Sequence, residues 1–333
     1  MLRTLSVRAE HWPLSTPFRI SRGVKTAADV VGVTLEQDGV QGRGEGVPYA
    51  RYGETIDSVL AQVNGLAQDI SRGMSRHDLA SRLGPGAARN AIDCALWDIE
   101  ARLAGRAVAE TLGQPPLHPL VSALTVSLDT PQAMGEAAAR MTGATLIKVK
   151  VDQNDPAACL AAVRAAAPDA DLIVDPNESW TIEILGSLQP VLAQLKIALI
   201  EQPLPAGEDG ALAGFRSCAP ICADESCHVA ADLPGLKDRY QVVNIKLDKS
   251  GGLTEALDLL RQARAMHFGV MVGCMVSSSM SIAPAFHVAR HADFVDLDGP
   301  TWLANDYAGG AVQRGANLLP PQGLWGVPDG PEA

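Results

Sequence analysis

The chain has 333 residues, of which 47% are hydrophobic and 20% charged, so it can form more than one domain around a sizeable core. Its formal net charge of -11, without a basic run, argues against nucleic acid or an anionic membrane surface as a partner. The N-terminal segment lacks the apolar core of a signal peptide, and no stretch is long and apolar enough to span a membrane. We therefore expect a cytoplasmic protein, and its cysteines include no C-x-x-C pair.

The first part of the chain, residues 1–115, predicts a small α+β domain. Three segments have strand character: 5–14, 30–39 and 40–48. The Asp38-Gly39 dipeptide predicts a hairpin between the second and the third of these strands. Helical patterns then follow over 54–70, 75–83 and 87–105. The Pro-rich segment 113–120 predicts a connection to a second domain.

From Val121 onward, short apolar runs alternate with Ala- and Leu-rich helical stretches. The runs are 121–128, 144–151, 170–175, 197–201, 219–224, 241–247, 268–273 and 292–298. Strands that alternate with helices predict parallel β-α units, and eight such strands predict a (β/α) barrel over 116–299. The tail from about 300 to 333 is too long for barrel closure alone, and we expect it to pack on the first domain.

Most of these runs have a charged residue at their last or next-to-last position. Three successive runs end in carboxylates, at Asp175, Glu201 and Asp224. The C-terminal ends of barrel strands meet at one face, where active sites lie, so these three side chains should converge. Oxygen ligands on a rigid ring suit a hard divalent cation, and the pattern predicts a magnesium site.

Lysines flank the carboxylates. Lys148 and Lys150 share one face of the second predicted strand, and Lys246 ends the sixth, across the barrel. A substrate between them would have an amine on each side, which suits removal of a proton from one face of a carbon and its return to the other. Burial and the like charge of the neighbouring ammonium group should lower the lysine pKa values. A salt-bridged pair that holds a strand end would also explain Lys148 and Lys150.

Other clusters have simpler interpretations. Cys218, Cys222, Cys227 and His228 could bind zinc, but no second ligand pair follows at zinc spacing. His287 and His291 are four residues apart, and we interpret them as a partly exposed helix face. The glycine-rich segment 42–46 opens no helix with dinucleotide-binding spacing, and we interpret it as a turn.

The ordered motifs resemble the enolase superfamily, muconate-lactonizing subgroup. They are K-V-K (148–150), D-P-N (175–177), E-Q-P (201–203), A-D-E-S (223–226) and K-L-D-K-S-G-G (246–252). The resemblance implies a modified TIM-type (β/α)7β barrel with an N-terminal α+β capping domain. Within the subgroup, D-L-D-G-P-T-W-L-A (296–304) is similar to the dipeptide epimerases.

The resemblance also implies residue roles. One Mg2+ per subunit would be held by Asp175, Glu201 and Asp224. Lys150 and Lys246 would be the acid/base catalysts. Asp248 would lie near Lys246 as an orienting partner, and Glu225 would also support the site from behind. Substrate contacts would come from Lys148, Arg22, Lys25, Asn177, Cys274, Met275, Asp296 and Asp298. Among these, Lys148 would contact the substrate carboxylate. Asp296 and Asp298 would bind the substrate ammonium group.

The loop 18–31 would close over the site. In the Ala-Glu epimerases an arginine of this loop meets the glutamate side chain, and Lys25 stands at that position here, after Arg22. Lysine keeps the charge but loses the bidentate fork. Pro176, inside the D-x-N motif, is a second departure from the family pattern.

The implied activity is a 1,1-proton transfer at the α-carbon of the C-terminal residue of a dipeptide, most of all L-Ala-D/L-Glu from murein peptides. N-acylamino acid racemase, o-succinylbenzoate synthase and cycloisomerase activities remain open, as do a non-catalytic metal-binding barrel and a Schiff-base aldolase. The partner would be a small-molecule dipeptide, and the chain could form a homo-oligomer.

Overall fold

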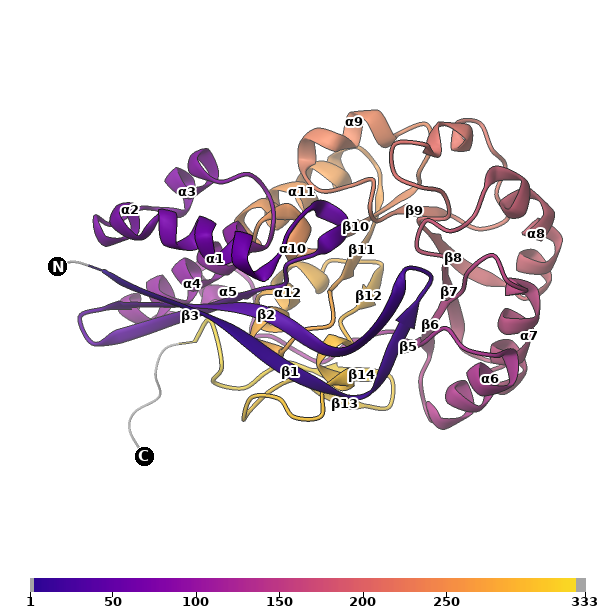
Figure 1. The fold of residues 1–333 in the computed structure, drawn as a ribbon, viewed down its shortest axis with the longest axis horizontal. Coiled ribbons are helices and arrows are strands. Elements are labelled where there is room, and N and C mark those ends of the chain that lie inside the picture. The colour runs from indigo at the N-terminus through magenta and orange to yellow at the C-terminus, as the bar shows by residue number, and fades with distance from the viewer. Residues whose placement is uncertain (1–2, 328–333) are drawn as a thin grey trace.

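The computed structural model describes residues 3–327, which form a capping sheet with its helices beside a barrel of parallel strands (Figure 1). The capping sheet has the order β1-β2-β3 and is antiparallel. Its strands are β1 (Thr4–Ile20), β2 (Gly23–Gln37) and β3 (Val40–Gly46). Gln37 pairs with Val40, and Asp38 and Gly39 both have positive φ, at 57° and 79°, so the expected two-residue hairpin is confirmed.

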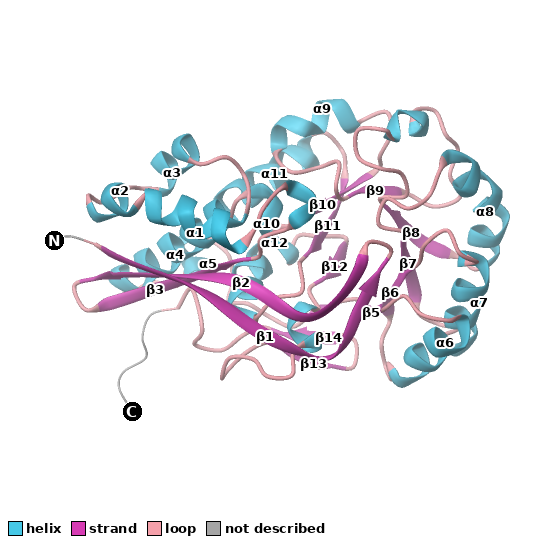
Figure 2. Cartoon of the chain, in the orientation of Figure 1, coloured by secondary structure: helices cyan, strands magenta, loops and turns pink. Residues whose placement is uncertain are grey.

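The expected loop over 18–31 is wrong, because most of it is strand. β1 and β2 continue beyond the predicted ends, with Phe18 opposite Lys25 and Ile20 opposite Gly23. Only Ser21 and Arg22 remain as the turn. Phe18 packs edge-on against Trp302, with ring centroids 4.7 Å apart. This apolar contact anchors the hairpin beside the barrel, so its tip lies over the strand ends as an ordered arm (Figures 1 and 2).

Helical segments follow the capping sheet, and three of them, α1, α2 and α4, pack against it. The segments are η1 (Ala50–Tyr52), α1 (Ile56–Gly65), α2 (Ala67–Ser71), α3 (Arg76–Arg82), α4 (Ala87–Ala104) and α5 (Val108–Thr111). The helix expected over 54–70 is divided, because Leu66 lies outside the helical region and separates α1 from α2. α4 ends at Gly105, which is left-handed as a helix C-cap requires.

The glycine-rich segment 42–46 is part of strand β3, and its interpretation as a turn is wrong. A Cβ atom at Gly42 would clash with Ile99, and one at Gly44 would clash with the Ala91 carbonyl group. These glycines therefore allow α4 to lie directly on β3. The sequence signal was the alternation of glycine with charged residues, which places the glycines on one face of a strand.

The second part of the chain forms an eight-stranded parallel sheet in which each strand neighbours the next along the chain. The strands are β5 (Leu124–Val126), β6 (Leu146–Lys150), β7 (Asp171–Asp175), β8 (Ile197–Glu201), β9 (Ile221–Ala223), β10 (Val242–Ile245), β11 (Gly269–Gly273) and β12 (Phe294–Asp296). The first and last strands approach each other, since Ala123 N–H donates to the Val295 carbonyl at 2.8 Å. The barrel with its α+β cap is thus confirmed.

Helical segments connect the strands on the outside of the barrel (Figure 2). They are α6 (Pro131–Arg140), α7 (Pro156–Ala166), α8 (Ile182–Gln194), η2 (Asp209–Leu212), η3 (Ala230–Asp232), α9 (Leu233–Leu236), α10 (Leu247–Ser250), α11 (Leu253–Ala265) and α12 (Ser279–Ala289). Between β8 and β9 the described connection holds only the short η2. In the described part of the chain, no helix is long and apolar enough to cross a membrane.

The tail returns to the first part of the chain. After η4 (Gly299–Trp302), strands β13 (Val312–Arg314) and β14 (Asn317–Leu319) form an antiparallel sheet with β4 (Leu120–Val121). The predicted strand over 121–128 is therefore divided between β4 and β5. Trp325 Nε1 donates to the Cys94 carbonyl at 3.0 Å, so the tail contacts α4. The expected tail extends to 333, and residues 328–333 lie outside the described part.

Candidate active site

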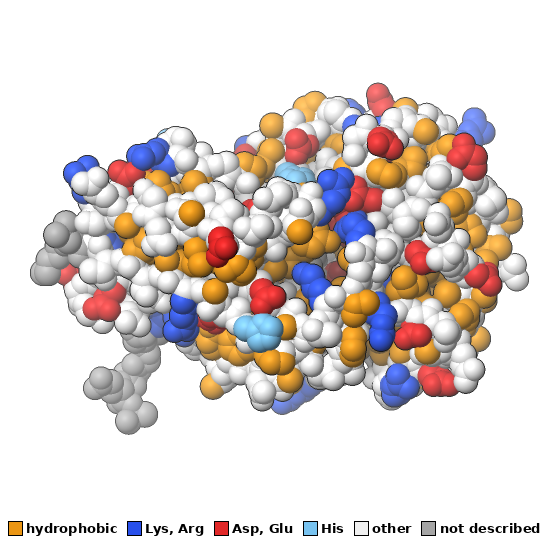
Figure 3. All heavy atoms as spheres, in the orientation of Figure 1, with side chains coloured by type: hydrophobic (Ala, Val, Ile, Leu, Met, Phe, Trp, Pro, Cys, Tyr) orange, Lys and Arg blue, Asp and Glu red, His pale blue; other side chains and the backbone are white. Residues whose placement is uncertain are grey.

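A cavity of about 520 Å³ lies at the C-terminal ends of the barrel strands. The β1–β2 hairpin tip and the segment around η1 cover it, and Lys and Arg side chains gather around the hollow between cap and barrel (Figure 3). Ten of the residues expected to act in catalysis or substrate binding line this one cavity: Arg22, Lys25, Lys148, Lys150, Asn177, Lys246, Cys274, Met275, Asp296 and Asp298.

The three expected metal ligands lie buried below the cavity. Asp175 ends β7, Glu201 ends β8 and Asp224 directly follows β9, so the parallel sheet places them on neighbouring strands. Within residues 3–327, however, no group of three or more His, Cys, Asp or Glu side chains has a geometry that could hold a metal ion. Lysine ammonium groups contact the carboxylates directly.

Four lysines make these contacts. Lys148 Nζ lies 3.0 Å from Asp175 and 2.7 Å from Glu201 Oε2. Lys150 Nζ lies 2.6 Å from Asp175, and Lys246 and Lys249 each lie 2.7 Å from Asp224. Such buried charges are tolerated because each has a partner of opposite sign.

The chemistry of the oxygen donors fits a divalent cation. Glu201 Oε2 is buried and accepts no hydrogen bond, although Lys148 Nζ is close to it. Burial raises the pKa of Glu201 to about 7, and the nearby Asp175 adds to the increase. A carboxylate that is buried without a hydrogen-bond donor is stabilised by a cation, and hard oxygen ligands select magnesium-like ions.

The electrostatics of the lysines differ from expectation. Burial lowers the pKa of Lys148, but the carboxylates of Asp296, Glu201 and Asp175 outweigh burial and raise it well above its ordinary value. The pKa of Lys246 is raised in the same way, because Asp224 outweighs burial and the like charge of Lys148. The predicted lowering of the pKa is therefore wrong for Lys246, the expected acid/base group, whereas Lys148 was expected to stay charged. The sequence placed lysines and carboxylates at one face of the barrel but did not show which of them would be in direct contact.

Lys249 is a buried residue of this cluster that the sequence did not predict as functional. Its ammonium group donates to Asp224 Oδ1 at 2.7 Å and to the carbonyls of Cys227 and Asn244 at 2.9 Å each. Lys249 thus fixes the Asp224 side chain from behind. The only sequence signal for a functional role of Lys249 was its place within K-L-D-K-S-G-G. Its burial was not expected, because a lysine after a strand end is usually exposed.

Asp296 and Asp298 stand together at the end of β12. Asp296 Oδ2 accepts from Lys148 at 2.9 Å, whereas its buried Oδ1 accepts no hydrogen bond. Asp298 Oδ2 accepts from the Thr125 N–H at 2.7 Å. Burial and the neighbouring Asp296 raise the pKa of Asp298 to about 6. Two carboxylates that face one cavity with an unused oxygen favour a cationic ligand group.

The two supporting carboxylates have partners from the cap. Asp248 Oδ1 accepts from the Val47 N–H at 2.8 Å and from Asn90 Nδ2 at 2.7 Å, so its hydrogen bonds join the barrel to the cap. This differs from the expected role of orienting Lys246, because the described contact of the Lys246 ammonium group is Asp224. Burial raises the pKa of Asp248 to about 7. Glu225 Oε1 accepts from Arg22 at 2.7 Å, and its Oε2 is buried without a hydrogen bond.

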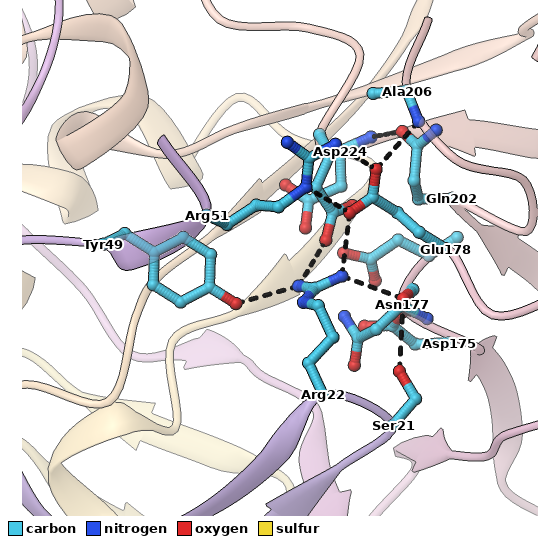
Figure 4. A network of polar contacts seen from close by, with 12 residues as sticks. Ser21, Arg22, Tyr49, Arg51, Asp175, Asn177, Glu178, Gln202, Ala206 and Asp224 are labelled. Carbon is cyan, nitrogen blue, oxygen red and sulfur yellow. Dashed lines mark hydrogen bonds and ion pairs between the residues drawn. The ribbon is translucent and has the colours of Figure 1, made fainter. Parts of the chain in front are cut away.

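Arg22 and Lys25 have different surroundings at the hairpin tip. Arg22 donates to Glu225, to Tyr49 Oη at 2.8 Å and to the Asn177 carbonyl at 2.8 Å (Figure 4). The Lys25 side chain makes no hydrogen bond or ion pair among the described residues, and its Nζ lies 5.4 Å from the Tyr49 ring centroid. Burial lowers the pKa of Lys25. Lys25 is therefore the hairpin cation that is available to a ligand in the cavity.

Asn177, Cys274 and Met275 line the cavity as expected. Asn177 has a φ of 47°, and its N–H donates to Asp175 Oδ1 at 2.9 Å, so the turn after β7 is left-handed. Its side-chain Oδ1 is buried without a hydrogen bond. The short turn that starts at Pro176 thus presents one unpaired acceptor toward the cavity.

The cysteines and histidines considered as alternative metal ligands have other surroundings. Cys222 and Cys227 are buried free thiols, and Cys218 is exposed. α12 ends at Ala289, so His291 lies beyond the helix, and His287 is buried rather than on a partly exposed face. Both histidines contact Gln114, at 3.2 Å each.

Two family comparisons cover almost the whole chain. Residues 2–113 match the mandelate racemase / muconate lactonizing enzyme N-terminal domain, and residues 132–323 match the enolase C-terminal domain-like family. The chain belongs to the enolase superfamily. The resemblance drawn from the sequence motifs is therefore confirmed.

Individual relatives are epimerases and racemases. An L-Ala-D/L-Glu epimerase from Escherichia coli (strain K12) is 48% identical over 92% of this chain and 96% of its own. An N-acetyl-D-glutamate racemase from Pseudoalteromonas sp is 46% identical over 89% of this chain and 95% of its own.

Solved structures of the superfamily have the same fold. One, from Agrobacterium tumefaciens, is an enolase family member with homology to dipeptide epimerases, with bound sodium and L-Ala-L-Glu and an ordered loop. It has a TM-score of 0.95 and 48% identity, and covers 97% of this chain and 100% of its own. A dipeptide epimerase from Cytophaga hutchinsonii, complexed with Mg and D-Ala-L-Val, has a TM-score of 0.89 and 29% identity, and covers 98% of this chain and 95% of its own.

Proposed function

We propose that this protein is a magnesium-dependent dipeptide epimerase that acts on L-Ala-D/L-Glu. One observation carries the proposal: Lys150 and Lys246 enter the same cavity from β6 and from the end of β10, which lie four strands apart in the eight-stranded barrel. Amines on opposite sides of a bound α-carbon can remove its proton from one face and return a proton to the other. This arrangement inverts the carbon without breaking any other bond.

The other cavity residues provide the charges that this reaction needs. Removing a proton next to a carboxylate creates a dianionic enolate, and the Lys148 ammonium group would lie beside the carboxylate. Asp175, Glu201 and Asp224 would hold one Mg2+ per subunit, which supplies further positive charge to the enolate oxygens when bound. The lysine ammonium groups would then exchange part of their present contacts with these carboxylates for contacts with substrate.

Both ends of the dipeptide have a matching group. The unpaired Asp296 Oδ1, with Asp298 beside it, would accept hydrogen bonds from the substrate α-ammonium group. Lys25 would meet the side-chain carboxylate of a C-terminal glutamate, since it faces the cavity without an ion-pair partner among the described residues. We further propose a cytoplasmic location, a small-molecule substrate as the sole partner class other than further copies of the chain, and no binding of nucleic acid.

Hydrogen exchange tests the proposed reaction. Incubating the protein with L-Ala-L-Glu and Mg2+ in D2O should place one deuterium at the glutamyl α-carbon and produce L-Ala-D-Glu, as followed by proton NMR and by mass. Because Lys150 and Lys246 would lie on opposite sides of the α-carbon, we expect hydrogen exchange at both of its faces. An absence of exchange across a panel of dipeptides would show that the proposed activity is wrong.

The relative that racemises N-acetyl-D-glutamate favours a second candidate function, racemisation of an N-acylamino acid. An N-acyl substrate has no ammonium group for Asp296 and Asp298. Asp298→Asn distinguishes the two candidates, because asparagine still accepts from the Thr125 N–H but carries no charge. For a dipeptide substrate, we expect kcat/KM to fall about 100-fold, as is usual when one partner of a buried charge pair is lost.

The same variant should leave the turnover of N-acetylglutamate nearly unchanged. Asp258→Asn, which removes a carboxylate from an exposed ion pair with Arg261 on α11, is the matched control. If Asp298→Asn has full activity on L-Ala-L-Glu, the aspartate pair does not bind the ammonium group, and the N-acyl candidate is favoured.

A further inference from the structure

Glu178 is a buried carboxylate outside the residue set that the sequence motifs assign, and it joins the barrel to two separate segments of the cap. It lies in the turn between β7 and α8, and its side chain is 7% exposed. Arg51 of η1 donates to both of its carboxylate oxygens, at 2.8 Å each. Arg22 of the hairpin turn donates to Glu178 Oε2 at 3.0 Å (Figure 4). Planar bidentate pairs of this kind are among the stronger ion pairs in proteins.

A third contact ties Glu178 to the next loop of the barrel. Its Oε1 also accepts from the Ala206 N–H at 2.8 Å, and Ala206 follows the strand that ends in Glu201. One carboxylate therefore links the turn after β7, the loop after β8, the hairpin tip and η1. The turn after β7, the hairpin tip and η1 line the cavity, so their relative positions depend on the same group.

The backbone at Glu178 shows that this turn is held under constraint. Asn177 and Glu178 are consecutive non-glycine residues with positive φ, at 47° and 67°. Such conformations are unfavourable for residues with a Cβ atom and persist where surrounding contacts enforce them. The Glu178 N–H donates to the Gln202 carbonyl at 2.9 Å, and its side chain supplies the remaining contacts. The turn places Asn177 against the cavity and follows directly on Asp175.

The hairpin has a second attachment to the barrel, near its base. The Arg19 N–H donates to Ser127 Oγ at 2.7 Å, and the Leu128 N–H donates to the Arg19 carbonyl at 3.1 Å. Loss of the Glu178 contacts would therefore loosen the turn at Ser21 and Arg22, while the strand at Phe18 and Arg19 stays in place. Lys25, which faces the cavity, lies opposite Phe18 and close to this turn.

We propose that Glu178 is a positioning residue for the epimerase: through Arg22 it holds the hairpin turn, and through Arg51 it holds η1, in the closed position over the cavity that Lys25 lines. The substrate named in this proposal rests on the proposed function, whereas the closure of the hairpin does not depend on it. When only a fraction of molecules is closed, the apparent dissociation constant rises in inverse proportion to that fraction. Bound substrate holds the tip closed again, so the rate of the chemical step, kcat, should change little.

Limited proteolysis without substrate tests the closure. In Glu178→Gln, trypsin should cleave after Arg22 at least about fivefold faster than in the unchanged protein, because cleavage follows the open fraction, which rises as the closed fraction falls. Glu183→Gln, an exposed carboxylate at the start of α8, is the matched control and should be cleaved at the unchanged rate. Mass spectrometry identifies the cut, and circular dichroism checks that the barrel remains folded.

Kinetics test the consequence. With L-Ala-L-Glu, Glu178→Gln should raise KM about fivefold and leave kcat within about twofold. Adding Arg51→Gln should change KM less in the Glu178→Gln background than in the unchanged protein, since both act through one contact. A purely structural role would instead lower the amount of folded enzyme and leave KM unchanged.

The outcomes separate the two proposals. Faster cleavage of Glu178→Gln without dipeptide exchange in any form of the protein would support the closure and contradict the proposed substrate. Unchanged cleavage in the absence of substrate would overturn the role of Glu178, whatever the kinetics show.

Discussion

Changing Lys246 to alanine is expected to reduce epimerisation of L-Ala-L-Glu by at least about 1,000-fold, because general acid–base groups contribute on this order. Lys150→Ala should have an effect of the same size, since inversion needs a proton acceptor on one face of the carbon and a donor on the other. Chiral chromatography of the hydrolysed product measures inversion. Lys237→Ala, which removes an exposed lysine, is the matched control and should retain full activity.

Exchange with solvent gives a sharper test than loss of activity. Each single variant keeps one lysine and should exchange deuterium into one glutamyl stereoisomer only, with opposite preference for the two variants. Removing Lys246 also leaves the buried Asp224 with fewer partners, which destabilises the fold. Lys246→Arg answers this difficulty, because arginine keeps the charge but does not deprotonate. Exchange into both stereoisomers by either variant at the unchanged rate would contradict the two-base arrangement.

Removal of the divalent metal should abolish the activity, and this is the second large effect that we expect. Treatment with EDTA should stop deuterium exchange, and added Mg2+ should restore it, because the metal stabilises the enolate charge. Asp224→Asn should lower Mg2+ affinity by at least about 100-fold, as measured by calorimetry, since a neutral amide is a poorer ligand for a hard cation than a carboxylate.

Asp238→Asn, at an exposed aspartate before β10, is the control for this substitution and should bind Mg2+ normally. The structure adds a reason for the size of the Mg2+ affinity loss expected in Asp224→Asn. Lys246 and Lys249 both contact Asp224, so a neutral residue there leaves two buried ammonium groups without their partner. Full exchange activity in excess EDTA would show that the lysines act without a metal ion.

The hairpin turn and the barrel order could be predicted from the sequence because their signals are local. Asp38-Gly39 adopts the two positive φ angles that a tight hairpin needs, whatever surrounds it. The apolar runs of the barrel carry their strand character within a few residues, and parallel order follows from the helices between them. Local signals gave the wrong interpretation where the structure of a segment depends on another segment of the chain that packs against it. The segment 42–46 looked like a turn until α4 was placed on its glycines.

Within the site, the sequence by itself determined which charged groups stand at the strand ends, because strand position sets where Lys150, Asp175 and Glu201 point. Only the tertiary structure decided how these charges are paired. Lys246 meets Asp224 from the neighbouring strand, and this pairing raises the pKa of a lysine for which the sequence alone predicted a lower value. Likewise, the two arginines that Glu178 binds are far from it in the chain. Pairing and desolvation are set by packing between distant segments, and local residue patterns do not encode them.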